Sequence, residues 1–270
     1  SNNDANHRND DNDSKNEPVD AECRTKMAEW CFHIAKHCEF QPETASMAIS
    51  LADRYVISKH GECALKNRKL FKLVVMTCFY TAIKVHEPEA LTPDLMHSLS
   101  RKEFKAKQFE KCEIRVLKAI QWKVNPPTSY SFARLYSDCI PKTLLKAEER
   151  QAVMKTVYKQ LEKATKDYSF IAIRPSTLAF AALSNSLSGY LKDIVMTALA
   201  DVCDIDTKES RVVEAKLQRR LNGKPADRNV FRLLSSSKFV QSSRKTLVPS
   251  SSKRSSREEN KSPRTVTAAC

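Results

Sequence analysis

Histidine and cysteine, which often bind transition metals, occur close together near the start of this 270-residue chain. His33 and His37 would face the same side of a helix, and His60 and Cys63 follow them. These are side chains that zinc prefers. However, a second helix of about 17 residues would carry His60 roughly 25 Å from its own start, away from the first pair. We therefore expect no metal site here and no other cofactor.

The sequence patterns of common enzymes are missing. We find no glycine-rich phosphate loop, no nucleophile elbow and no Ser/His/Asp grouping that one surface would hold. The three glycines, Gly61, Gly189 and Gly223, follow or interrupt amphipathic runs, where a left-handed helix cap is expected. Nine cysteines without a C-x-x-C pair indicate reduced, mostly buried thiols. The chain is expected to be all-helical, without catalytic activity and without a small-molecule ligand.

Apolar residues recur at helical spacing, and capping residues, proline and glycine separate the runs. Helices are expected over residues 20–40, 42–60, 66–86 and 93–99, and from a Ser100–Glu103 capping box to near Ile120. The run LVVMTCFYTAI within 66–86 is apolar all round, which predicts a helix buried on every side. This run is too short to span a bilayer, so no membrane contact is expected.

A second set of helices follows the break at residues 125–128. They are expected near residues 128–139, 145–168, 175–187, 190–203 and 207–221. The helix over 175–187 contains LAFAAL, a second run that is apolar all round. The sequence predicts two tandem five-helix bundles between two disordered tails. The four segments are an acidic tail over 1–19, bundles over 20–125 and 126–221, and a basic, serine-rich tail over 222–270.

The formal net charge of +14 is unevenly distributed. Residues 1–22 carry a net charge of −5, and residues 222–270 carry +8. A basic chain raises the question of nucleic acid. No single helix shows a dense Arg/Lys face with interleaved aromatic residues, so a solvated lysine surface is the expected interpretation and nucleic acid is not the expected partner.

Four strings appear in the order and helical positions of a cyclin box. They are RTKMAEWCFHIAKHCEF, ETASMAISLADRYV, TAIKVHE and FEKCEIRVLKAIQWKVNPPTSYSF. The chain resembles the cyclin family over residues 20–221, most strongly over 23–132, and IAIRPSTLAFAAL is similar to the C-terminal cyclin fold. The resemblance implies a regulatory subunit that forms a heterodimer with a cyclin-dependent Ser/Thr protein kinase. It also implies activation of that kinase by stabilising its C helix, in cell-cycle control.

The resemblance assigns a structural ion pair. Cyclins carry an arginine six residues before a tryptophan on the first helix, and here Arg24 precedes Trp30. Its partner by the same likeness is Asp53, in LADRY. The alternative is that Arg24 and Asp53 are two independent, solvated surface charges.

The resemblance also assigns a kinase-binding pair. Lys84, in TAIKVHE, and Glu113, in CEIRVLK, match the lysine and glutamate with which the family contacts its kinase. Both are expected at an exposed edge, where their charges would suit backbone groups beside the kinase's C helix. An ion pair within the chain is the alternative, and the two interpretations are compatible. The matching apolar surround is Val85, Leu117, Trp122 and Val124.

The chain departs from the family on the first helix. Cys23, Lys26 and His33 stand where some cyclins have an apolar or acidic patch that docks Arg-x-Leu peptides. This puts substrate docking through that helix in doubt.

The basic tail predicts further features. KRSSR at residues 253–257 suggests nuclear import, so a location in nucleus and cytoplasm is expected, and Ser262 before Pro263 is a minimal site for a proline-directed kinase. The alternative function is a cyclin-fold transcription adaptor that binds DNA or the transcription machinery. No cysteine pair exists to build the zinc ribbon usual in that group, and the presence of Lys84 and Glu113 favours a kinase.

Overall fold

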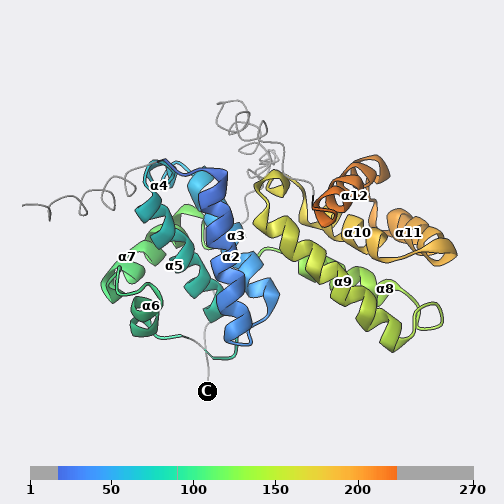
Figure 1. The fold of residues 1–270 in the computed structure, drawn as a ribbon, viewed down its shortest axis with the longest axis horizontal. Coiled ribbons are helices and arrows are strands. Elements are labelled where there is room, and N and C mark those ends of the chain that lie inside the picture. The colour runs from blue at the N-terminus through green and yellow to red at the C-terminus, as the bar shows by residue number, and fades with distance from the viewer. Residues whose placement is uncertain (1–17, 90, 224–270) are drawn as a thin grey trace, which may run out of the picture. The chain divides into compact units, whose positions relative to one another are not determined.

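The computed structural model describes residues 18–89 and 91–223, in which every regular element is a helix (Figure 1). The predicted all-α class with two tandem bundles is confirmed. The first bundle contains α2 (Ala21–His37), α3 (Pro42–Ile57), the short α4 (Glu62–Leu65), α5 (Arg68–His86), α6 (Pro93–Leu99) and α7 (Ala106–Ala119). The second contains α8 (Ser129–Cys139), α9 (Ala147–Lys166), the 3-10 turn η2 (Tyr168–Phe170), α10 (Pro175–Ser186), α11 (Gly189–Cys203) and α12 (Thr207–Leu221).

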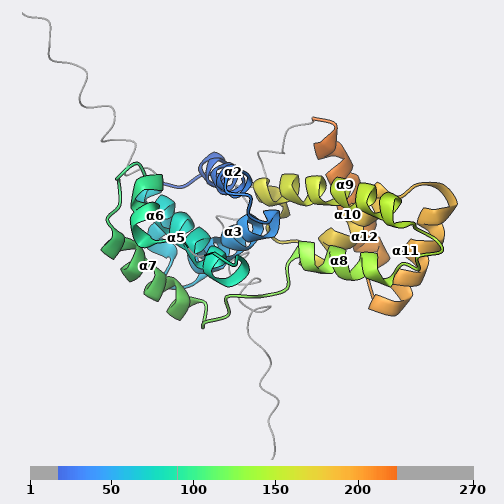
Figure 2. The same cartoon turned by 90° about the horizontal axis from the view of Figure 1, so that it is seen from below.

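The first bundle is built around α5. All residues of α5 from Leu73 to Ile83 are buried, as the apolar run predicts. Figure 2 shows α2 and α3 on one side of α5 and α6 and α7 on the other. Trp30 of α2 packs edge-on against Phe79, with ring centroids 5.5 Å apart. Because α5 is apolar on all sides, it lies in the core of the first bundle, in contact with α7 among others.

The second bundle repeats this plan around α10. Every residue from Thr177 to Ser184 is buried, and α10 packs against α8, α9 and α12. None of the helices in the described residues is long and apolar enough to cross a membrane.

The predicted tails fall almost wholly outside the described residues. Pro18 and Val19, assigned to the acidic tail from the sequence, are described and make contacts. The Val19 N–H donates to the Leu65 carbonyl at 2.8 Å, and Arg68 donates to the Pro18 carbonyl at 3.2 Å. Pro18 and Val19 are therefore part of the first bundle.

The predicted start of α7 was wrong. Ser100 is the C-cap of α6, and Arg101 and Lys102 follow it with φ of 55° and 62°. Glu103 forms an ion pair with Lys72 at 2.5 Å instead of capping a helix. The helix begins only at Ala106, because the Gln108 side chain accepts from the N–H of Lys105.

The left-handed cap predicted at Gly61 was also wrong. Gly61 has φ −98°, which any residue can adopt. Glycine is required there for space, because a Cβ would lie 2.0 Å from the Tyr55 carbonyl oxygen.

A buried carboxylate joins α3 to the N-cap of α8. Glu43 accepts hydrogen bonds from Thr128 and, at 2.9 Å, from Ser131, and pairs with Arg134 at 2.6 Å. Burial by itself would raise the pKa of Glu43, but these donors outweigh it and hold the pKa below its ordinary value. Glu43 thus carries its charge at neutral pH and helps to position the start of the second bundle.

Candidate functional site

Lys84 and Glu113 lie in direct contact. Lys84 is in the last turn of α5, and its Nζ is 2.5 Å from Oε1 of Glu113 on α7. The same Oε1 accepts a hydrogen bond from Thr81 at 2.9 Å, and Nζ of Lys84 lies 4.3 Å from the ring centroid of Tyr80. The ion pair considered from the sequence is therefore present within the chain.

The exposure of the two side chains differs. The Lys84 side chain is 35% exposed, whereas that of Glu113 is only 14% exposed. The expectation that both lie at an exposed edge was therefore wrong for Glu113, because packing against buried Thr81 draws it inward. Both contacts use Oε1, so among the described residues Oε2 of Glu113 has no hydrogen-bond donor and remains free to accept one.

Apolar side chains continue this surface along α7 and past its end. Val85 and Trp122 are 39% and 65% exposed, Leu117 is half-buried, and Val124 packs against the first core. The sequence prediction missed Ile114, which is 51% exposed. Its position on α7 opposite buried Phe109 and Val116 is the signal that would have identified it.

The backbone at Trp122 is held in one conformation by hydrogen bonds. Gln121 and Trp122 have φ of 56° and 58°, a left-handed conformation that costs non-glycine residues energy. The Trp122 N–H donates to the Leu117 carbonyl at 2.8 Å, as in a Schellman helix end. Arg54 of α3 donates to the Lys123 carbonyl at 2.7 Å. The indole thus projects from a backbone that two other segments hold in place.

Arg24 and Asp53 form a two-point ion pair. Nε and an Nη of Arg24 donate to the two carboxylate oxygens at 2.9 Å and 2.7 Å, and the side chains are 7% and 13% exposed. Burial by itself would lower the pKa of Arg24, but the Asp53 carboxylate outweighs it and raises the pKa. Arg24 also donates to the Thr165 carbonyl at 3.0 Å. Arg24 and Asp53 are thus a largely buried pair, and the alternative of two independent, solvated surface charges is wrong.

The altered patch on the first helix borders a groove of about 420 Å³ between α2 and α5. Cys23, Lys26 and Met27 line it, whereas exposed His33 does not. Most of its charged groups are already paired with each other, among them Arg68 with Asp20 at 2.9 Å. The groove is thus lined by mostly paired charges together with Cys23 and Met27.

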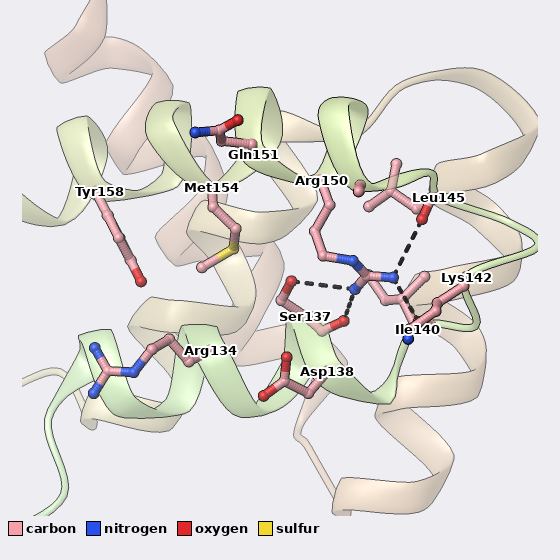
Figure 3. A pocket seen from close by; sticks show the side chains of 11 residues that line it. Arg134, Ser137, Asp138, Ile140, Lys142, Leu145, Arg150, Gln151, Met154 and Tyr158 are labelled. Atoms are coloured by element: carbon pink, nitrogen blue, oxygen red, sulfur yellow. Dashed lines mark hydrogen bonds between the residues drawn. The ribbon is translucent and has the colours of Figure 1, made fainter.

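A second groove, of about 580 Å³, lies between α8 and α9 (Figure 3). Its most buried cation, Arg150, donates to the carbonyls of Ser137, Ile140 and Leu145 at the end of α8 and the following turn. These bonds use the guanidinium to close the turn, so Arg150 is a structural residue and not an anion-binding group.

The histidines and cysteines form no cluster of metal-ligand type within the described residues. Of the eight described cysteines, Cys31, Cys78 and Cys112 are buried, and burial raises the pKa of each thiol. Cys38, Cys63 and Cys139 are exposed, so the expectation of mostly buried thiols was wrong.

Two family profiles match the chain in tandem. "Cyclin, N-terminal domain" matches residues 1–125, and "Cyclin, C-terminal domain" matches residues 127–247. Two such domains in succession define a cyclin-type regulatory protein. Because the profiles span most of its length, the chain belongs to the cyclin family.

Named relatives include cyclins of two types. The chain is 26% identical to Cyclin-D3-3 of Arabidopsis thaliana over 162 residues, which are 60% of this chain and 44% of that protein. It is also 26% identical to the G2/mitotic-specific cyclin-B of Drosophila melanogaster over 172 residues, 63% of this chain and 30% of that protein. The chain therefore spans less than half the length of these relatives.

Solved structures share the fold. A viral cyclin from herpesvirus saimiri superposes with a TM-score of 0.59 at 16% identity, covering 74% of this chain and 86% of that chain. A chain of the CAK complex of Chaetomium thermophilum superposes with a TM-score of 0.54 at 14% identity, covering 84% of this chain and 70% of that chain.

Proposed function

We propose that this cyclin binds and activates a cyclin-dependent Ser/Thr protein kinase as a heterodimer, in cell-cycle control. The observation that carries the proposal is the Lys84–Glu113 pair beside exposed Val85, Ile114 and Trp122. One relative is named as a G2/mitotic-specific cyclin, which supports the cell-cycle assignment.

The pair suits recognition of backbone groups. Oε2 of Glu113 is available to accept from a partner N–H, and Lys84 retains two ammonium hydrogens that can donate to a partner carbonyl. Hydrogen bonds to charged groups are stronger than neutral ones, and neighbouring apolar side chains would exclude water from them on binding. Trp122 has the size and exposure of an interface anchor.

Activation follows from selective binding of one kinase conformation. A kinase is idle when its C-helix glutamate is turned away from the strand lysine that holds the ATP phosphates. A rigid bundle that binds only the C-helix-in state shifts that equilibrium. Moving a kinase from mostly idle to mostly active requires about 5 kcal/mol of differential affinity.

The test measures kinase binding and activation by variants of the whole chain. The partner is a recombinant cyclin-dependent kinase that is monomeric on its own. Lys84→Ala, Glu113→Gln and Trp122→Ala should each weaken binding of the chain to this kinase. For Lys84→Ala and Glu113→Gln the loss of binding free energy should be about 2–5 kcal/mol. Glu113→Gln retains an acceptor for Thr81, so it should not unfold the bundle. Lys155→Ala on α9 and Tyr190→Ala on α11 are matched controls, since both residues are exposed and lie outside the site.

The outcome is read from binding titration, kinase activity and thermal melting together. Site variants that melt, bind and activate like the controls would show that Lys84 and Glu113 do not face the kinase. If the wild-type chain activates no kinase in a panel but binds duplex DNA with a steep salt dependence, the transcription-adaptor function replaces this one.

A further inference from the structure

The outer face of α7 is basic. Lys107, Lys111, Arg115 and Lys118 are all exposed, and within the described residues none of the four has an ion-pair partner. In contrast, Lys72, Lys84 and Lys192 elsewhere in the chain are each paired with a glutamate at 2.5 Å. The sequence interpretation concerned a basic helix face with interleaved aromatic residues; the exposed face of α7 is basic, and Phe109, its aromatic residue, is buried.

These charges form a stripe with an exposed apolar residue at its edge. At 100° per residue, Lys107, Lys111, Ile114 and Lys118 fall within an arc of about 60°. This arc points away from buried Phe109, Cys112 and Val116. Ile114, 51% exposed, thus lies at one edge of the lysines, between them and Glu110 and Leu117, instead of packing in the core. An exposed apolar side chain with another apolar residue on one side and cations on the other has the composition of an interface centre that meets its polar rim.

The stripe is continuous with the site already described. Glu113 is adjacent to Ile114 on α7, and Trp122 follows the end of the same helix. The basic stripe therefore borders the surface assigned to the kinase.

We propose that the basic stripe, defined as Lys107, Lys111, Arg115 and Lys118, docks an acidic flank of the partner kinase, with Ile114 entering an apolar pocket beside its carboxylates. This inference rests on the proposed function. It adds to that function that the negative charge of the kinase surface attracts this face of the cyclin, which speeds association and favours kinases with such a surface. Four unpaired cations on one face accelerate the encounter with an oppositely charged surface, an effect that salt removes.

Nucleic acid fits this face less well. Glu110 is exposed on the same helix, about 60° from Lys107, so a phosphate there would meet a like charge. Exposed Ile114 at the edge of the stripe also offers nothing to a phosphate backbone. An acidic protein surface with an apolar pocket satisfies both features.

The experiment compares two triple charge reversals in the full chain. The test variant is Lys107→Glu/Lys111→Glu/Lys118→Glu, and the control is Lys155→Glu/Lys159→Glu/Lys163→Glu on α9, where the lysines are likewise exposed and without ion pairs in the described part of the chain. Both change the net charge equally. Association rates with a recombinant monomeric cyclin-dependent kinase are measured by stopped flow at about 0.05 M and 0.5 M salt, with circular dichroism melts alongside.

The test variant should associate about tenfold or more slowly than the control at low salt, and the difference should shrink at high salt. If the test and control variants associate at equal rates and the wild-type chain binds the kinase, the proposed docking role of the stripe is wrong, while the proposed function stands. The same conclusion follows if the test variant keeps its kinase association rate but loses binding to a labelled 20-base-pair DNA duplex. Failure of the wild-type chain to bind any kinase would remove both proposals.

Discussion

The Arg24–Asp53 pair makes a quantitative prediction about stability. Arg24→Ala and Asp53→Ala should each destabilise the first bundle, and the double variant should lose less than the sum of the two. The reason is that each single change leaves one charge in a largely buried position without its partner.

The structure sets the magnitude. Both hydrogen bonds of the pair have good length, and neither side chain is more than 13% exposed, so breaking the pair should cost about 3–5 kcal/mol. Arg24→Ala also removes the donor to the Thr165 carbonyl, so it should be the more damaging single variant. The coupling energy should be roughly 1–3 kcal/mol, in the upper part of the range for contacting residues.

Tryptophan fluorescence in urea is the suitable assay. The chain has two tryptophans, and both lie in the first bundle, where Trp30 packs on Phe79. Their emission therefore reports unfolding of the bundle that contains the pair. Losses that add to within about 0.5 kcal/mol would show that the two groups do not stabilise each other, whatever their distance.

Four further predictions concern single features. Gly61→Ala should lower the urea midpoint, with a cost above about 2 kcal/mol, since its Cβ would meet the Tyr55 carbonyl. Gln121→Gly should be neutral or stabilising by up to about 1 kcal/mol in the same assay, because the position is left-handed. The folded-state pKa of Glu43 is depressed, so its contribution to the free energy of unfolding is full at neutral pH and is lost as pH falls through that pKa. Glu43→Gln should therefore destabilise the chain at pH 7 and much less in acid. Urea unfolding titrations across this pH range measure the difference. Residues 222–270, with KRSSR at 253–257, should carry a fluorescent reporter into the nucleus.

Each of these has a clear contrary result. A Gly61→Ala protein of unchanged midpoint would mean that the connector relaxes without cost. A Gln121→Gly variant less stable by more than about 1 kcal/mol would mean that the glutamine side chain, not the backbone, holds the turn. A constant Glu43→Gln penalty at all pH values would remove the electrostatic explanation. A reporter that stays in the cytoplasm, with one carrying a substituted KRSSR as the control, would remove the import signal.

The central helices were predictable from the sequence. A run such as Leu73–Ile83 that is apolar on every side has one stable environment, the inside of a bundle. The same argument predicted the buried part of α10. These elements depend on local composition, which a sequence states directly.

The helix ends were less predictable because several capping arrangements compete. Ser100 and Glu103 have the types and spacing of a capping box, but Ser100 accepts from the Phe104 N–H at 3.2 Å while Phe104 is buried. Burial of that ring, together with the left-handed turn before it, moves the start of α7 to Ala106. Sequence spacing does not report such a tertiary preference.

The kinase-binding role of the candidate site stays a prediction, and the sequence did not report the environment of its residues. The residues Lys84, Glu113 and Trp122 came from a family resemblance, but the inward position of Glu113 depends on Thr81, a neighbour on another helix. Ile114 was missed because an isolated isoleucine near Val116 suggests a core residue until the helix face is known.

The turn that carries Trp122 has a thermodynamic consequence. Ordering one residue's backbone costs about 1–2 kcal/mol, and a flexible loop would incur that cost for several residues when a partner binds. Here the Leu117 carbonyl and the Arg54 guanidinium have already fixed the backbone in the free chain. Only the two side-chain torsions of the indole are left to be restricted, so under the proposed function the entropy lost at Trp122 on association with the kinase would be small. Under the proposed function, the left-handed strain at Gln121 and Trp122 would thus be a cost of folding that reduces the later cost of binding.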